Sequence, residues 1–114
     1  MLVKIHIKST AQGVELVALH GDLDFHSSQE LRTELLKLAD RQVLKLLVDF
    51  NKVDYIDSSG LAAFVELFQR MKLYNGQLAL FNLSDGVRDI FEIAKLDSIF
   101  RLAQSEKEAT SFFS

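Results

Sequence analysis

A pair of adjacent serines near the middle of the chain offers the clearest chemistry. They occur in the tetrapeptide Asp57-Ser58-Ser59-Gly60. Apolar residues follow at helical spacing, so the two hydroxyl groups are expected at the start of a helix. A helix start exposes backbone amides and carries the positive end of the helix dipole, and both favour a nearby anion. A phosphate on Ser58 would add a charge of about −1.5 to −2. A phosphate at this position would therefore change the local surface charge while the fold stays in place.

The same tetrapeptide also has a purely structural explanation. Asp57 or Ser58 could cap the helix, and Ser59 could fill its first turn. Gly60 could allow the helix to pack closely against another backbone. Capping is the commonest role of such residues, so spacing alone favours this second explanation.

Other polar side chains are expected to gather near these serines. Functional groups in open α/β sheets collect beyond the carboxyl ends of parallel strands. Three predicted loops follow such strands, at residues 21–26, 51–58 and 82–86. Their polar residues are Asp22, Asp24, Asp54, Asp57, Ser58, Ser59 and Ser84. If the three strands are neighbours, these side chains share one edge of the domain, and Asp24 is expected near the Ser58 hydroxyl.

The strands that position these loops are predicted from apolar segments. Residues 2–7 and 14–20 flank a polar link that ends at Gly13, which predicts an antiparallel hairpin. Later strands are predicted at 43–50, at 78–81 and around 99–102. Helices separate these later strands, so right-handed crossovers should make them parallel. The predicted fold is α/β, with a mixed β-sheet that begins with an antiparallel hairpin, continues with parallel strands and is covered by α-helices.

The helices are predicted from periodicity and from their end signals. They begin near Ser27, at Ser58, near Ser84 and at residue 105. Ser27 and Glu30 have the spacing of a capping box. Ser84 can cap the third helix, and Gly76 can end the second. The second helix, over 58–74, carries an apolar stripe of Leu61, Phe64, Val65, Phe68 and Met71.

Length and composition limit the class of protein. The 114 residues suit one domain over 1–114, and 48% hydrophobic with 25% charged residues is ordinary for a soluble chain. A net charge of −3 with scattered basic residues argues against direct binding of nucleic acid. The absence of cysteine excludes disulfides and thiolate metal sites. No export signal and no apolar run long enough to cross a bilayer are visible, so a cytoplasmic protein without membrane attachment is expected.

The chain closely resembles the STAS family, named for sulfate transporters and anti-sigma factor antagonists, from about residue 3 to residue 110. Two motifs carry the resemblance: Gly21-Asp22-Leu23-Asp24 and Ile56-Asp57-Ser58-Ser59-Gly60-Leu61. Further matches are Gly76, Val87, Ile90, Phe91 and Leu96. One departure is Lys95, which stands where the family often has a helix-ending glycine. Lys95 must accept the glycine geometry at some cost, or the helix must end differently.

The resemblance implies a STAS-like fold and the function of an anti-sigma factor antagonist. In bacterial antagonists with this motif the first serine is the phosphoacceptor, which corresponds to Ser58, with Ser59 as the second choice. The unphosphorylated antagonist binds an anti-sigma factor that is also a serine kinase, phosphorylation releases it, and a metal-dependent serine phosphatase restores it. Nucleotide and metal belong to those partners, so no cofactor is expected on this chain. The expected partner-binding residues are Asp22, Asp24, Asp57, Ser58, Ser59 and Gly60.

Other functions remain open at this point. Similar single-domain proteins serve as regulatory subunits of signalling scaffolds or of lipid transporters. A serine hydrolase is conceivable from His6, His20 and His26, but no nucleophile-elbow motif is present and two of these histidines fall on predicted strands. A receiver domain with an aspartate phosphoacceptor would lack the initial hairpin. We therefore expect a binding module without catalytic activity. At the C-terminus, Phe112 and Phe113 cannot easily face one stripe, so at least one is expected in the core and the other exposed or covering a partner.

Overall fold

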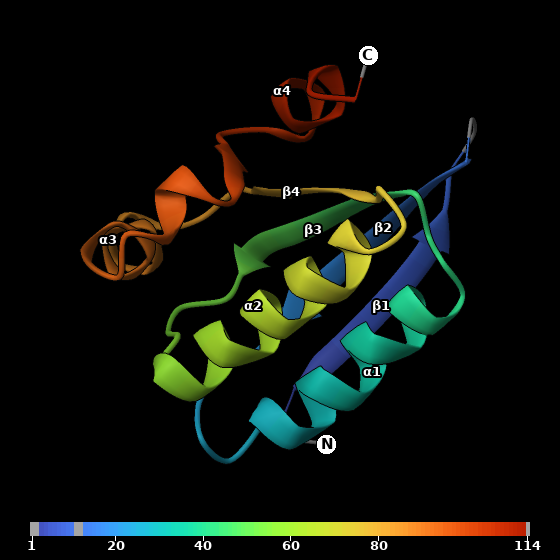
Figure 1. Cartoon of the computed structure of the whole chain (residues 1–114). Helices are drawn as coiled ribbons and strands as arrows, with labels where there is room; N and C mark the ends of the chain where they lie inside the picture. The colour runs from blue at the N-terminus through green and yellow to red at the C-terminus, as the bar shows by residue number, and fades with distance from the viewer. Residues whose placement is uncertain (1–2, 11–12, 114) are drawn as a thin grey trace.

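The computed structural model describes residues 3–10 and 13–113 of the chain. A five-stranded sheet in the order β1-β2-β3-β4-β5 forms its centre (Figure 1). The strands are β1 (Lys4–Ser9), β2 (Val14–His20), β3 (Lys45–Lys52), β4 (Gln77–Phe81) and β5 (Arg101–Ala103). β1 pairs with β2 in antiparallel register, and every later pairing is parallel. The predicted mixed sheet with an initial hairpin is thus confirmed, although most strand boundaries move by about two residues, as is usual for such predictions. Residue 2 of the predicted first strand lies outside the described residues.

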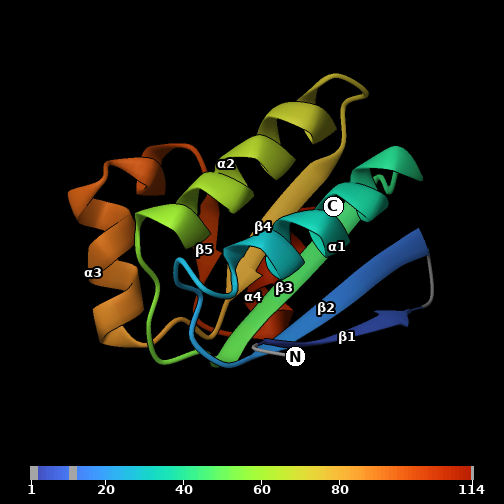
Figure 2. The ribbon, with the colours of Figure 1, turned by 90° about the horizontal axis from the view of Figure 1, so that it is seen from below.

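The helices cover the two faces of the sheet unequally. They are α1 (Ser28–Asp40), α2 (Ser58–Lys72), α3 (Asp85–Ile93), the 3-10 turn η2 (Leu96–Ser98) and α4 (Glu106–Ser111). Figure 2 shows α1 and α2 side by side across one face, with α3 toward the N-terminal end of α2. α4 lies on the opposite face of the sheet.

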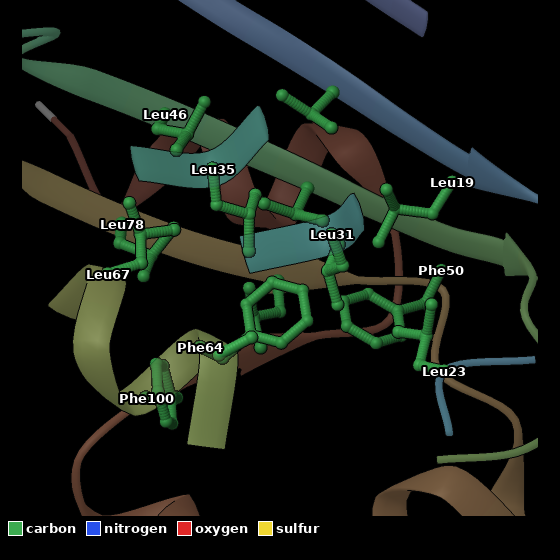
Figure 3. Close-up of a cluster of buried hydrophobic side chains, with 14 of the residues drawn as sticks. Leu19, Leu23, Leu31, Leu35, Leu46, Phe50, Phe64, Leu67, Leu78 and Phe100 are labelled. Carbon is green, nitrogen blue, oxygen red and sulfur yellow. The ribbon is translucent and has the colours of Figure 1, made fainter. Parts of the chain in front are cut away.

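A large apolar core holds α1, α2 and α3 against the sheet. Alternate residues of β3 point to opposite faces, so Leu46, Val48 and Phe50 enter this core while Leu47 enters the smaller cluster under α4. Figure 3 shows the core side chains, in which the Phe50 and Phe64 rings have centroids 5.3 Å apart. Burial of each such side chain contributes about 1.5–3 kcal/mol. This core fixes the start of α2 relative to the carboxyl ends of the strands.

The apolar stripe of α2 differs in part from its prediction. Leu61, Phe64 and Met71 are buried as expected, but Val65 and Phe68 are only partly buried. Leu67 is fully buried in their place, since α1 packs against one flank of α2 as well as the sheet behind it.

The capping box predicted at the start of α1 is wrong for Ser27. Ser27 precedes α1 in a helical conformation and makes no side-chain cap. Its Oγ instead donates to the Asp22 carbonyl at 2.6 Å and accepts from the Asp24 amide at 3.0 Å. The buried Ser27 hydroxyl therefore closes the preceding loop, because that loop offers both a donor and an acceptor within reach.

Three helix ends adopt left-handed backbone at residues other than glycine, the first at Gln42 after α1 with φ 55°. After α2, Asn75 takes the left-handed position with φ 63°, and not Gly76 as predicted. Gly76 is favoured by its close contacts, since a Cβ there would lie 2.9 Å from the Tyr74 ring and 3.2 Å from the Val43 carbonyl oxygen. After α3, Lys95 accepts the glycine geometry with φ 60° and ψ 28°, at the cost that left-handed backbone imposes on a residue with a Cβ.

Both C-terminal phenylalanines are partly buried against the cluster under α4, so neither is left fully exposed. The Arg101 guanidinium holds Phe112 by donating to its carbonyl at 2.7 Å and lying 5.8 Å from its ring centroid.

Candidate functional site

The loops after β2 and β3 are joined by backbone pairing. Leu23 and Ile56 form an isolated parallel bridge, and both side chains are buried. The Leu23 amide donates to the Tyr55 carbonyl at 2.9 Å, and the Asp57 amide donates to the Leu23 carbonyl at 3.0 Å. The two loops therefore form one rigid edge at the start of α2, as expected from the ends of neighbouring parallel strands.

The third predicted loop is held differently. The Asn82 side chain donates from Nδ2 to Asp49 Oδ1 at 3.2 Å, which ties this loop to β3. Ser84 caps α3 as predicted, accepting from the Val87 amide at 3.2 Å. Its hydroxyl is thus used in capping. The candidate site consists of the first two loops and the start of α2.

Asp57 links these two loops through both carboxylate oxygens. Its Oδ1 accepts from the amides of Ser59 at 2.9 Å and Gly60 at 3.2 Å, which makes it the N-cap of α2. Its Oδ2 accepts from the Phe25 amide at 3.1 Å, across the loop interface. Hydrogen bonds to a carboxylate are stronger than those between neutral groups. Asp57 is therefore both a helix cap and a clamp between the loops.

Gly60 brings α2 into close contact with the first loop. A Cβ at this position would lie 2.5 Å from the Leu23 carbonyl oxygen and 2.9 Å from Ile56 Cγ1. No side chain fits there without moving the backbone. The structural explanation of the tetrapeptide thus accounts for Asp57 as the cap and Gly60 as the contact.

Ser58 has no such structural role. It is the first residue of α2, is exposed, and its hydroxyl makes no hydrogen bond within the described part of the chain. It opens onto a groove of about 700 Å³ between α2 and the turn that follows α3, whose lining includes Leu61, Val65 and Leu96. Ser59 is half-buried and lines a different, smaller hollow between α1 and α2. The two serines therefore face different surroundings.

The electrostatics at Ser58 correct one expectation from the sequence. The amides of Ser59 and Gly60, which were expected to favour a phosphate, already bond to the Asp57 carboxylate. A phosphate on Ser58 would lie beside that carboxylate and would have to share the positive end of the helix dipole with it. The site tolerates an added anion less well than an uncapped helix start.

The aspartates of the first loop have separate roles. Asp24 Oδ1 accepts from the amides of His26 at 2.9 Å and Ser27 at 3.1 Å, so this carboxylate organises its own loop. No hydrogen bond joins it to Ser58 among the described residues. The Asp22 and Asp54 side chains are exposed on the same edge.

Two exposed aromatic residues beside the site were missed by sequence reasoning. Phe25 is 75% exposed and Tyr55 is 51% exposed. Tyr55 precedes the buried Ile56, and the backbone amide of Phe25 donates a hydrogen bond to Asp57. The sequence did offer a signal for this exposure, because both aromatics lie in polar loops and outside any periodic apolar pattern.

An ion pair joins the helices next to Ser59. Arg32 donates from Nε and Nη2 to the two carboxylate oxygens of Glu66, at 2.7 and 2.8 Å. These hydrogen bonds lower the pKa of Glu66 and raise the pKa of Arg32. The pair fixes α1 relative to α2 on the flank of the site.

The histidines do not assemble with the serines. His6 lies on β1, His20 ends β2, and the ring of His26 makes an edge contact with Phe25 at 5.8 Å between centroids. Within residues 3–10 and 13–113, no cluster of three or more His, Cys, Asp or Glu side chains could hold a metal ion. In the same ranges, no helix is long and apolar enough to span a membrane.

A sequence model of the STAS domain matches residues 7–109, and the chain therefore belongs to the STAS domain family. It is 34% identical over 107 residues to an anti-sigma-B factor antagonist of Bacillus subtilis, covering 93% of this chain and 96% of that protein. An anti-sigma-B factor antagonist of Listeria monocytogenes is 29% identical over 108 residues, with 95% of each chain covered.

Solved structures of similar fold agree with this assignment. The crystal structure of an anti-sigma factor antagonist from Mycobacterium paratuberculosis superposes with a TM-score of 0.86 at 17% identity, covering 96% of this chain and 92% of the other. The Bacillus cell fate determinant SpoIIAA in its phosphorylated form gives a TM-score of 0.74 at 19% identity, with 97% and 100% covered. The family and the fold expected from the sequence motifs are confirmed.

Proposed function

We propose that this chain is an anti-sigma factor antagonist whose binding is switched by phosphorylation of Ser58. Unphosphorylated, it binds an anti-sigma factor that is also a serine kinase, and phosphorylation releases it. The observation that carries the proposal is the Ser58 hydroxyl, exposed and without a hydrogen bond among the described residues beside a cap already supplied by Asp57. The names of the relatives from Bacillus subtilis and Listeria monocytogenes support the same function.

The proposed switch acts through local charge. A kinase that phosphorylates Ser58 must bring its nucleoside triphosphate to this hydroxyl. The new bond joins Ser58 Oγ to the γ-phosphorus, the bond from that phosphorus to the β-phosphate oxygen breaks to release the nucleoside diphosphate, and the hydroxyl proton passes to a base of the kinase. The phosphoserine then faces the nucleoside diphosphate that the partner holds, and the two anions repel each other. Each 1.4 kcal/mol of repulsion lowers affinity about tenfold, so a partial loss is enough for release.

The rigid edge limits how far the backbone responds. Leu23 and Ile56 are buried and paired, and Asp57 bonds to both loops. We therefore propose that phosphorylation removes contacts between this chain and its partner while the backbone of this chain stays in place. Of the expected binding residues, Asp22, Ser58 and the half-buried Asp24, Asp57 and Ser59 can touch a partner, whereas buried Gly60 acts by placing α2.

Phosphopeptide mapping and affinity measurement test the proposal together. The cognate anti-sigma factor, purified with its nucleotide, is expected to modify Ser58 and to bind the unmodified chain. Ser58→Ala should bind and resist phosphorylation, while Ser58→Asp should bind weakly. The control Ser59→Ala should bind and remain a substrate. Modification chiefly at Ser59, or equal affinity of the phosphorylated and native chains, would contradict the mechanism.

We also propose that a metal-dependent serine phosphatase resets the switch and that the chain itself has no hydrolytic activity. Among the described residues no histidine side chain hydrogen-bonds to Ser58 or Ser59, which supports this view. Esterase, phosphatase and peptidase substrates should give only background turnover. Turnover that Ser58→Ala abolishes would refute it.

A further inference from the structure

We propose that Phe25 and Tyr55 are apolar anchors that hold the partner on the Ser58 face, an inference that rests on the proposed function. Among the large apolar side chains exposed in the described part of the chain, these two are the aromatic ones, with 75% and 51% of their area exposed. Aromatic residues are enriched among the few positions that dominate the energy of protein interfaces. The two residues come from the two loops that pair through Leu23 and Ile56.

The backbone of Phe25 is hydrogen-bonded to Asp57, the residue that precedes Ser58. The Phe25 amide donates to Asp57 Oδ2, and Oδ1 of the same carboxylate caps the helix that begins at Ser58. The Tyr55 carbonyl accepts from Leu23, which holds the second loop in register. Anchors on a preorganised backbone lose less conformational entropy when they are buried, so more of their contact energy appears as affinity.

The charge around these aromatics indicates the chemistry of the partner surface. Loop residues 21–27 and 51–60 contain four aspartates and one cationic side chain, the exposed Lys52 at the end of β3. Asp22 and Asp54 are exposed, and Asp24 is half-buried. A complementary surface on the kinase has an apolar pocket for the aromatic rings with lysine or arginine at its rim. The rim faces these aspartates, while the nucleotide faces Ser58.

Two of the other exposed apolar side chains provide matched controls. Leu73 is 85% exposed and lies past the far end of α2, about 22 Å along the helix from Ser58 at 1.5 Å per residue. Leu44 is 57% exposed and precedes β3, at the opposite end of that strand from Tyr55. Neither belongs to the two paired loops. Exposure alone therefore predicts equal effects for all four residues, whereas the proposed surface predicts effects for only two.

The test uses the full chain and the anti-sigma factor kinase, first retained on the immobilised unphosphorylated protein, then identified and purified. Titration calorimetry is expected to show that Phe25→Ala and Tyr55→Ala each raise Kd by about tenfold or more, as truncation of an interface anchor does. Leu73→Ala and Leu44→Ala should change Kd by less than about twofold. All four variants should keep the wild-type midpoint of urea unfolding, since the side chains are largely exposed.

Phosphorylation kinetics provide a second readout. Phe25→Ala and Tyr55→Ala should raise KM for the chain as kinase substrate while kcat stays near the wild-type value, because the anchors lie outside the reacting atoms. Added salt should weaken binding, and Asp22→Asn with Asp54→Asn should reduce that salt dependence.

The outcomes separate this inference from the proposed function. If the kinase binds the wild-type chain and both aromatic variants bind within twofold of it, the anchors are refuted and the switch stands. If effects of the control variants equal those of the aromatic variants, the proposed surface is also refuted. If no kinase binds the wild-type chain, the proposed function itself fails.

Discussion

Replacing Asp57 with alanine should destabilise this protein more than the loss of an ordinary helix cap. Its carboxylate accepts three backbone hydrogen bonds, two at the start of α2 and one from Phe25 in the other loop. Ser84 offers a natural comparison, because its hydroxyl caps α3 through a single bond to Val87. The difference between the two alanine variants isolates what the clamp between the loops adds.

The magnitudes follow from the number and type of bonds. Loss of an N-cap side chain costs about 1 kcal/mol, which is the expected effect of Ser84→Ala. Asp57→Ala loses the cap and also leaves the Phe25 amide without its charged acceptor, a further cost of about 1–1.5 kcal/mol. The free energy of unfolding should therefore fall by about 2–2.5 kcal/mol. The loss of unfolding free energy for Asp57→Asn should lie between those of Ser84→Ala and Asp57→Ala. The asparagine amide oxygen can cap α2, but its NH₂ group cannot accept a hydrogen bond from Phe25.

Urea unfolding monitored by circular dichroism measures these differences. With a slope of about 1.5 kcal/mol/M, the midpoint should drop by about 1.5 M for Asp57→Ala and by about 0.7 M for Ser84→Ala. The exposed Asp54 is the control, and Asp54→Ala should stay within about 0.5 kcal/mol of the wild type. If Asp57→Ala and Ser84→Ala lose the same stability, the clamp between the loops contributes nothing and the reasoning is refuted.

Three further predictions concern the packing and charge around the site. Gly60→Ala should lower the free energy of unfolding by about 2–3 kcal/mol, because its Cβ has no space, whereas Gly86→Ala, in open space on α3, should raise it by up to about 1 kcal/mol. Lys95→Gly should raise the thermal midpoint, with a gain of about 0.5–1 kcal/mol from relief of the left-handed backbone. Glu66→Gln should flatten the decrease in stability at acid pH: Arg32 lowers the pKa of Glu66, so the pair stabilises the fold at neutral pH and the effect is lost as pH falls through the lowered value.

Each of these predictions has a result that contradicts it. Equal stability of the two glycine variants would mean that α2 can move away from the first loop at little cost. A lower melting temperature for Lys95→Gly would show that the lysine side chain stabilises the turn by more than its backbone costs. An unchanged acid profile for Glu66→Gln, measured by urea unfolding from pH 7 down to about pH 3, would show that solvent already screens the exposed pair.

Much of the architecture could be predicted because its signals are local. Apolar segments and helical periodicity indicated the alternating strands and helices, and the link ending at Gly13 indicated the hairpin. Ser84 was correctly predicted as a cap, since an N-cap depends on amides two or three residues away. For the same reason, the local sequence predicted that α2 begins at Ser58 and offered Asp57 as a possible cap.

The partners of the loop side chains were decided only by the tertiary structure. Ser27 had capping-box spacing, yet its hydroxyl bonds to Asp22 and Asp24 because the folded loop presents both groups to it. Asp57 lies 32 residues from Phe25, and only the pairing of two parallel strands brings its carboxylate to that amide. Sequence spacing determines which groups can bond within one helix turn. Competition among donors and acceptors that are distant in the chain is settled by packing, and this is why the sequence alone indicated a phosphate-accepting helix start at Ser58 while the structure revealed that Asp57 already occupies its amides.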